Sequence, residues 1–257
     1  MIDLFDLTGK IALVIGAAPG GIGHAQALGL AEYGADVVIA GSSQADAEEV
    51  AGEVRTRGRK SLALTVDVTQ EQSVADMVRH ILEVFPHIDI LVNDFSTRIR
   101  KPAVDFPVAE WQHVMDVNAR GCFLCCQAVG REMVKRRSGK IINHSSVRGQ
   151  YGLPSGYAAY CSSKGAIDTL TKTLACEWAK YNVLVNAIAP TFVTTKTRDT
   201  TFAEPDPEFV KMVTARIPLG RWGLPEDFVG PTIFLASKAA DFITGQILYV
   251  DGGVTTW

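Results

Sequence analysis

Short runs of apolar residues alternate along the chain with longer segments in which apolar residues recur at helical spacing. The short runs contain almost no polar residues, which is typical of strands that are buried on both faces of a parallel sheet. The predicted strands are 11–15, 37–40, 62–66, 88–92, 140–143, 184–189 and 247–250. The predicted helices between them are 25–33, 45–58, 74–85, 111–135 and 158–181. This alternation predicts an α/β fold with one doubly wound parallel sheet and helices on both of its faces.

The alternation continues from end to end, so we expect a single domain, residues 1–257, that both binds a nucleotide and carries out the chemistry. No internal repeat, low-complexity segment or linker divides it. The least regular part begins after the strand 184–189, is rich in Thr and contains Pro205 and Pro207. Ligands bind outside the carboxyl ends of the strands in such sheets, so we expect a substrate loop around 191–215.

Composition excludes several classes of function. With 47% hydrophobic and 21% charged residues in 257, the chain has the make-up of an ordinary globular protein with a sizeable core. A net charge of −3 without a basic run argues against a nucleic-acid partner. The first residues lack the pattern of a signal peptide, and no apolar stretch reaches the length of a membrane span. We therefore expect a cytoplasmic protein with no membrane contact.

The chain has 5 Cys, and three of them, Cys122, Cys125 and Cys126, crowd together within a predicted helix. A metal site needs a second cluster at matching spacing, and none follows, so we expect no metal. Small buried thiols in a reducing compartment are the simpler interpretation.

A glycine-rich turn joins the first predicted strand to the helix that follows it. It reads Gly16-Ala17-Ala18-Pro19-Gly20-Gly21-Ile22-Gly23. Glycines let a backbone approach a pyrophosphate, and a helix N-terminus offers free N–H groups and the positive end of the helix dipole. The turn therefore predicts a dinucleotide site formed by Gly16, Gly21, Ile22 and Gly23.

Tyr160 and Lys164 stand four residues apart near the start of a predicted helix, which places both on one face. An ammonium group beside a phenol stabilises the phenolate. A phenol in this setting accepts the proton of an alcohol as hydride leaves, and donates the proton in the reverse direction.

These two motifs resemble those of the short-chain dehydrogenase/reductase family, T-G-x-x-x-G-x-G after the first strand and Y-x-x-x-K after the fifth. Two departures concern the glycine turn: Ile15 replaces the Thr, and one extra residue makes the loop bulge around Pro19. The resemblance covers the whole chain. It implies a Rossmann-type fold and NAD or NADP as cofactor. It also implies interconversion of a secondary alcohol and a ketone, and a homotetramer.

The resemblance also implies further site residues. The partner hydroxyl is assigned to Ser146, with Ser145 second, although Ser146 precedes Tyr160 by one residue more than is usual. Asn118 resembles the residue that breaks a helix locally and holds a water leading to the Lys. The remaining cofactor positions are Ser42, Ser43, Asp67, Val68, Asn93, Pro190, Val193 and Thr195, together with Tyr160 and Lys164.

Two of these positions, and His144 beside them, depart from a simple assignment. Gly41-Ser42-Ser43 carries neither the acidic residue that selects NAD nor the Arg that selects NADP, so both cofactors remain possible. The usual Asn-Asn-Ala-Gly after the fourth strand reads Asn93-Asp94-Phe95-Ser96 here, which alters the wall behind the cofactor. His144 is either an acid–base group or a residue packed beside its strand.

The substrate is predicted less directly. The stretch from Ile99 to Pro102 is similar to gluconate 5-dehydrogenase and 2-deoxygluconate 3-dehydrogenase members. Arginine forks suit carboxylates and sulfonates, so we expect an anionic sugar derivative or polyol. The alternatives are an apolar ketone, such as a steroid, terpenoid or aromatic one, and a nucleotide-binding module without turnover. Residues expected at the substrate are Arg98, Arg148, Gln150, Tyr151 and Tyr157, with Arg100 and Lys101 in the same loops.

Overall fold

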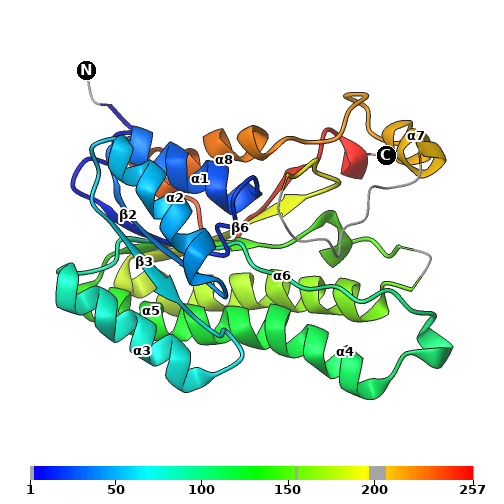
Figure 1. The fold of residues 1–257 in the computed structure, drawn as a ribbon, viewed down its shortest axis with the longest axis horizontal. Helices are drawn as coiled ribbons and strands as arrows, with labels where there is room; N and C mark the ends of the chain where they lie inside the picture. Colours follow the sequence, from blue (N-terminus) through cyan, green and yellow to red (C-terminus); the bar gives the residue numbers. More distant parts are fainter. Residues whose placement is uncertain (1–2, 154–155, 197–206, 257) are drawn as a thin grey trace.

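A computed structural model describes residues 3–153, 156–196 and 207–256 of the chain. Its centre is one sheet of seven parallel strands in the order β3-β2-β1-β4-β5-β6-β7 (Figure 1). The doubly wound fold expected from the sequence is therefore confirmed. The strands are β1 (Ile11–Ile15), β2 (Asp36–Gly41), β3 (Ser61–Thr65), β4 (Ile90–Asn93), β5 (Gly139–His144), β6 (Val183–Pro190) and β7 (Ile247–Val250).

Helices cover both faces of this sheet (Figure 1). One layer consists of α1 (Ile22–Glu32), α2 (Gln44–Thr56) and α8 (Val229–Ala236). The opposite layer consists of α3 (Glu71–Val84), α4 (Val108–Met115), α5 (Gly121–Arg136) and α6 (Ala158–Trp178). A further helix, α7 (Pro207–Thr214), lies apart from both layers, near the C-terminus (Figure 1).

Alternation along β1 shows how one strand serves both layers. Leu13 and Ile15 belong to the core under α3, α5 and α6, whereas Ala12 and Val14 belong to the core under α1, α2 and α8. Successive side chains of a strand point to opposite faces, so a strand covered on both sides must be apolar throughout. This requirement explains why runs of consecutive apolar residues predict the strands of the sheet.

The structure differs from the expected helices in three places. The long helix expected over 111–135 is two helices, α4 and α5, separated by a π-helical turn at Asp116–Arg120. Helix α1 begins at Ile22, earlier than expected, because its first turn contains the glycines that favour a turn. Helices α7 and α8 were not expected, since Pro207 and Pro231 and short length obscure their periodicity.

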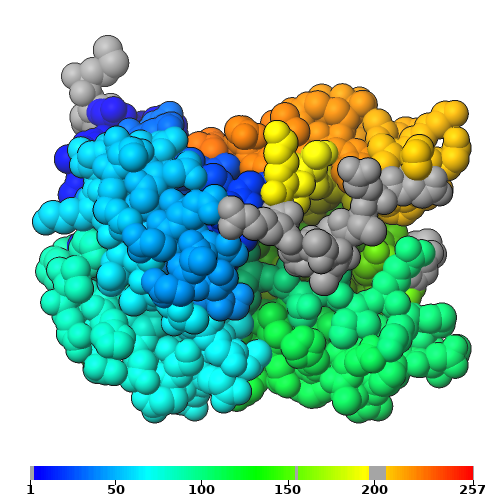
Figure 2. Space-filling view, viewed as in Figure 1, coloured from blue at the N-terminus to red at the C-terminus, as the bar shows by residue number. Residues whose placement is uncertain are grey.

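Because the strands are parallel, their carboxyl ends lie at the same edge of the sheet. The order of the strands reverses between β1 and β4, which is the position at which ligands bind in sheets of this kind. The segment just after β6, yellow in Figure 2, reaches the surface between the blue N-terminal part and the orange C-terminal part. Within the described ranges, no helix is both long and apolar enough to cross a bilayer.

Candidate active site

The extra residue of the glycine turn is accommodated by a tight turn over Ala18–Gly21. Gly21 donates its N–H to the carbonyl of Ala18 at 3.0 Å, and Gly20 between them has a φ of +76°. Pro at the second position and Gly with positive φ at the third are the residues that a type II turn prefers. The expected bulge around Pro19 is therefore a regular turn.

Gly16 is the most constrained residue of this turn. Its φ is +97°, and a Cβ added there would lie 2.5 Å from the carbonyl oxygen of Asp94. A side chain would be strained in this conformation and would push the first loop away from the fourth strand. Gly16 thus lets the loops after β1 and β4 lie in contact.

We expect Gly16→Ala to lower the free energy of unfolding by about 1–3 kcal/mol, because Ala meets both the positive φ and the Asp94 backbone. Thermal unfolding followed by circular dichroism measures the loss. Gly52→Ala is the matched control: Gly52 lies in α2, a Cβ there would make only an ordinary contact with the Arg55 side chain at 3.8 Å, and Ala favours a helix. An unchanged melting temperature for Gly16→Ala would contradict this account of the turn.

The start of α1 fits the pyrophosphate of a dinucleotide. Gly21 is extended at the N-cap and, as a glycine, has no side chain of its own to cap the helix. The N–H of Gly23 is bound by Asp94 Oδ2, whereas the N–H of Ile22 has no acceptor in the described part of the chain. A free N–H at the positive end of a helix dipole, beside small residues, is a suitable donor to a phosphate oxygen.

The next strands contribute polar groups at the same edge. Ser42 is exposed after β2, whereas the Ser43 hydroxyl accepts a hydrogen bond from the N–H of Asp46 and caps α2. Asp67 is exposed and accepts hydrogen bonds from the N–H and hydroxyl of Thr69, which lower the pKa of its carboxyl. The N-cap of α3 is Gln70, so Asp67 does not cap that helix.

Asn93 and the segment after β6 are the remaining positions expected at the cofactor. Asn93 is buried and donates to Asn143 Oδ1 at 2.9 Å, which ties β4 to β5 at the level of the site. Pro190 ends β6, and Val193 forms a bridge to Gly223. Thr195 is exposed near the end of the described segment. All three follow the same strand end, as the resemblance implied.

Tyr160 and Lys164 lie on one face of α6, as the spacing predicted. The ammonium of Lys164 is 5.7 Å from the centroid of the Tyr160 ring. Lys164 is only 2% exposed, and its Nζ donates to the backbone carbonyl of His144 at 2.8 Å. Within the described residues, no group forms a hydrogen bond with the Tyr160 hydroxyl. A phenol beside a buried cation is therefore available to a ligand.

Ser146 is the second residue after the end of β5 and is buried. Its hydroxyl donates to the carbonyl of Pro190 at 3.3 Å and accepts from the N–H of Arg148 at 3.1 Å. Ser145 points instead toward α6, with its hydroxyl 3.5 Å from the carbonyl of Lys164. The two serines thus face different surroundings, and Ser146 is the one bonded to the strand end that carries Pro190.

Asn118 lies within the π-helical turn and is fully buried. Its side chain accepts the N–H of Thr97 at 2.7 Å, and donates to the carbonyl of Thr97 at 2.8 Å and to the Ser163 hydroxyl at 2.9 Å. The π-turn directs the amide toward the loop after β4 and toward α6 together. The local helix break that the resemblance implied is present, and such turns often occur at functional sites.

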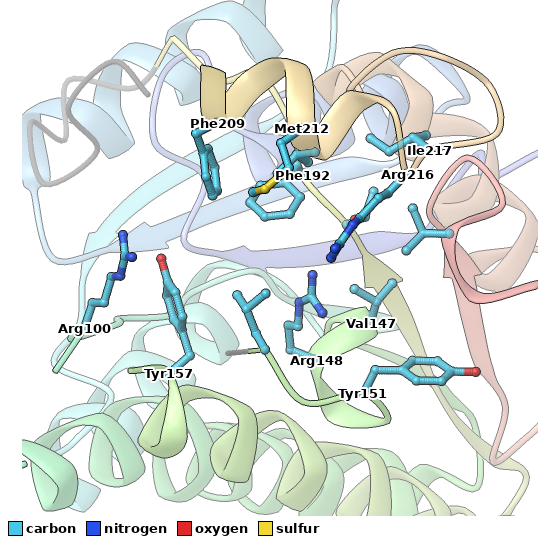
Figure 3. A pocket seen from close by; sticks show the side chains of 14 residues that line it. Arg100, Val147, Arg148, Tyr151, Tyr157, Phe192, Phe209, Met212, Arg216 and Ile217 are labelled. Carbon is cyan, nitrogen blue, oxygen red and sulfur yellow. The ribbon is translucent and has the colours of Figure 1, made fainter. Parts of the chain in front are cut away.

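A cavity of about 460 Å³ opens beside Tyr157 (Figure 3). Tyr157, whose ring centroid is 6.4 Å from that of Tyr160, forms one wall. Val147 and Arg148 follow Ser146 into a second wall. The other lining residues are Arg100, Tyr151, Leu153, Thr191, Phe192, Phe209, Met212, Val213, Arg216, Ile217 and Val254.

The structure brings together only some of the residues expected at the substrate. Arg148, Tyr151 and Tyr157 line the cavity, as does Arg100. Arg98 and Gln150 are not among its described lining residues, and Gln150 lies instead between the hydroxyls of Tyr151 and Tyr249. Lys101 is held away by Glu110 at 2.6 Å.

The sequence analysis missed the upper wall of the cavity in Figure 3, which consists of Phe192, Phe209, Met212 and Arg216. Phe209 and Met212 lie on α7, and Arg216 follows it. The expected substrate loop, 191–215, includes most of this wall, but its middle part, 197–206, lies outside the described residues, as does Trp257. The only local signal for this wall was a cationic residue, Arg216, directly before Ile217 and Pro218.

Two cations face one another in this cavity. The guanidinium groups of Arg148 and Arg216 point toward each other (Figure 3). Burial lowers the pKa of the Arg148 guanidinium below its usual range, and the nearby Arg216 cation adds to the effect. Across the described ranges, neither Arg forms an ion pair with a carboxylate. Two positive charges in a partly buried cavity favour the binding of an anion.

Comparison with known proteins identifies the family to which this chain belongs. The family model described as enoyl-(acyl carrier protein) reductase matches residues 16–255. A 2-dehydro-3-deoxy-D-gluconate 5-dehydrogenase of Pseudoalteromonas atlantica is 42% identical, with 98% of each chain covered. An NAD-dependent glycerol dehydrogenase of Listeria innocua is 40% identical, over 98% of this chain and 96% of the relative.

A solved structure is similar over almost the whole chain. It is a gluconate 5-dehydrogenase from Burkholderia cenocepacia in complex with NADP and tartrate, with a TM-score of 0.91 and 36% identity. The alignment covers 99% of this chain and 98% of that one. The chain belongs to the short-chain dehydrogenase/reductase family, as an NAD(P)-dependent dehydrogenase acting on a CH–OH group. The expected family, enzyme class and cofactors are thereby confirmed.

Proposed function

We propose that this dehydrogenase interconverts a secondary alcohol and a ketone in an anionic sugar derivative, with Arg148 and Arg216 binding the acidic group. The facing guanidiniums in the cavity beside Tyr157 carry this proposal. Arginine is well suited to carboxylates because its planar fork donates two parallel hydrogen bonds. An acid held there places the rest of a short sugar chain beside Tyr157 and Tyr160.

In this proposal Tyr160 exchanges the proton of the reacting oxygen. The bound nicotinamide supplies hydride transfer. Lys164, buried and held by the carbonyl of His144, stabilises the phenolate of Tyr160 electrostatically. Ser146 positions the substrate oxygen through its hydroxyl, and Asn118 keeps the loop after β4 and helix α6 in register.

The cofactor residues follow from the strand ends. The N–H of Ile22, with Gly16, Gly21 and Gly23 shaping the turn, would hold the pyrophosphate. Ser42, Ser43, Asp67, Val68 and Asn93 would surround the adenosine and central part, and Pro190, Val193 and Thr195 the nicotinamide end. Since Ser42 and Ser43 are neutral, both NAD and NADP are compatible with this end of the site.

The relatives support an acidic substrate. The Pseudoalteromonas relative is named for a sugar acid, and the Burkholderia structure holds tartrate, a hydroxy dicarboxylate. The Listeria relative is named for glycerol, an uncharged polyol. Relatives of nearly equal identity thus differ in the charge of their substrates, which makes the arginines of this chain the informative feature.

We expect Arg148→Ala and Arg216→Ala each to raise the KM for an acidic sugar by about tenfold to a hundredfold, since a lost charge-assisted hydrogen bond costs about 1.5–3 kcal/mol. The turnover number should change less, because neither group lies at the reacting oxygen. Initial rates with gluconate, 5-keto-D-gluconate and 2-dehydro-3-deoxy-D-gluconate, read at the nicotinamide absorbance, measure both constants.

Glycerol is the matched uncharged substrate in this experiment, and its KM should be the same in wild type and variants. Arg148→Lys should rescue only part of the affinity, because a point charge does not reproduce a fork. An unchanged KM for every acidic substrate in both alanine variants would refute the proposed anion site.

A second candidate substrate class is supported by the apolar residues of the same cavity. Phe192, Phe209 and Met212 form an apolar surface, with the Phe192 and Phe209 rings at 5.8 Å edge to face. This wall favours a flat apolar ketone, as the alternative expectation held. An aromatic ketone in the same screen, reduced faster than any sugar acid, would select this alternative.

Titration with NADH and with NADPH, followed by nicotinamide fluorescence, is the first step of the screen, because it selects the cofactor.

The homotetramer stays a prediction. The exposed aromatic residues Trp111 of α4 and Phe123 of α5, at 36% and 40% exposure, support a contact on that face.

A further inference from the structure

A buried polar chain runs behind the site through His144, the last residue of β5. His144 is 5% exposed, and its Nδ1 lies 3.0 Å from Asp94 Oδ1. Its Nε2 lies 2.8 Å from Nε2 of Gln26, a fully buried residue of α1. Gln26 Nε2 also lies 2.7 Å from the Thr232 hydroxyl on α8.

With the Gln26 amide nitrogen toward both His144 and Thr232, the donors and acceptors of this chain select one tautomer of the imidazole. Thr232 donates its only hydroxyl proton to the carbonyl of Phe228 at 2.8 Å, so it accepts from Gln26. Gln26 therefore donates its other amide proton to Nε2 of His144, which carries a lone pair. The remaining nitrogen, Nδ1, then bears the proton and donates it to the Asp94 carboxylate.

Both ends of the His–Asp pair reach the reaction machinery. Asp94 Oδ2 accepts the N–H of Gly23, in the first turn of the helix that begins at the glycine turn. The backbone carbonyl of His144 accepts the ammonium of Lys164 at 2.8 Å. His144 thus connects two parts of the site: its side chain reaches the glycine turn through Asp94, and its main-chain carbonyl binds Lys164.

Simple core packing does not call for this pair. Position 144 shares a face of β5 with Ile142, which belongs to the apolar core under α1 and α8. An aliphatic side chain at 144 would continue that core, whereas a buried carboxylate and imidazole lose hydration. The polar pair therefore has a use other than filling space.

We propose that His144 and Asp94 are positioning residues that hold the start of α1 and Lys164 in a fixed relation. The pair assigns the Gly23 amide to the protein and leaves the Ile22 amide for the pyrophosphate. It also fixes the carbonyl that orients the Lys164 ammonium toward Tyr160. This inference rests on the role proposed for Lys164.

The test compares His144→Ile, which removes both side-chain hydrogen bonds, with His144→Asn, whose amide keeps a donor near the position of Nδ1. We expect His144→Ile to lower kcat about tenfold to a hundredfold and to weaken NADH and NADPH binding about fivefold to tenfold. His144→Asn should recover cofactor affinity to within about threefold of wild type. Asp94→Asn should resemble His144→Ile, because its amide cannot accept from both His144 and Gly23.

His87→Asn is the matched control. His87 contacts buried Asp89 at 3.1 Å at the opposite edge of the sheet, so its loss tests a His–Asp contact remote from the site. It should leave kcat and cofactor affinity unchanged even if the melting temperature falls.

An independent readout needs neither substrate nor cofactor. Nitrogen-15 spectra of the histidine-labelled protein should show His144, assigned by its absence in His144→Asn, as the Nδ1–H tautomer, and Asp94→Asn should shift that signal. An Nε2–H tautomer would overturn the inference, as would a His144→Ile variant with wild-type kcat and cofactor affinity. If His144→Ile does not fold, Asp94→Asn decides in the same way. A fully active Lys164→Met would instead refute the role proposed for Lys164.

Discussion

Replacing Tyr160 by Phe is expected to lower kcat about a thousandfold while NADH or NADPH still binds. The change removes one oxygen, and positioned general acid–base catalysis accounts for about 10²–10⁴-fold in rate. The Tyr160 ring packs edge to face against Tyr157, and Phe keeps that contact. Steady-state rates in both directions, with cofactor affinity from fluorescence, separate the loss of proton transfer from a loss of binding.

Tyr33→Phe is the control for this variant, because Tyr33 is 46% exposed at the end of α1, away from the strand ends that form the site. Its rates should equal those of wild type. A Tyr160→Phe enzyme with more than about a tenth of the wild-type kcat would show that another group moves the proton.

Lys164→Met is expected to lower kcat at least about a hundredfold. Two charges about 6 Å apart interact by about 3 kcal/mol at an effective dielectric constant of about 20, which is about two powers of ten in rate. Met has nearly the same length, so the apolar contacts of the buried stem remain. The loss should be larger in kcat than in KM, since the cation acts on the phenolate of Tyr160.

Lys172→Met serves as the control, since Lys172 is exposed two turns further along α6. It removes an equal charge from the same helix without touching the site. If both variants lost activity equally, the net charge of the helix would explain the effect, and the buried ammonium would have no special role.

The parallel sheet was predictable because the fold requires a recognisable run of apolar residues in every strand. Each strand is covered on both faces, so apolar residues occupy consecutive positions, as Leu13, Val14 and Ile15 do. The glycine turn and the Tyr160–Lys164 spacing were also recognisable, because the residues of each motif lie close together in the sequence. Such features need no knowledge of what lies across the fold.

The cavity was predicted only in part. Arg148 and Tyr157 both precede Tyr160, by 12 and 3 residues, so their nearness to it followed from the short segment between β5 and α6. Arg216 reaches Arg148 from the far side of α7, across 68 residues of chain, and no local pattern announces that contact. Arg98, expected at the substrate from its loop alone, is not among the residues that line the cavity, whereas Arg100 of the same loop is.

His144 shows the same limit within a single residue. From the sequence it was either an acid–base group or a packed strand residue, since the order of residues does not reveal its partners. The sheet order brings β4 beside β5, and the crossover brings α1 over both, so Asp94 and Gln26 meet the imidazole from 50 and 118 positions away.

The sequence by itself thus determined the fold class, the dinucleotide turn, the proton-transfer pair and the family of the enzyme, because periodicity and short spacing encode them locally. Tertiary structure alone decided which cations share the cavity, which serine is hydrogen-bonded to the carbonyl of Pro190, and what holds Lys164 in place. These depend on contacts between segments distant in the chain, and strand order, helix crossing and burial establish such contacts only once the whole core has formed.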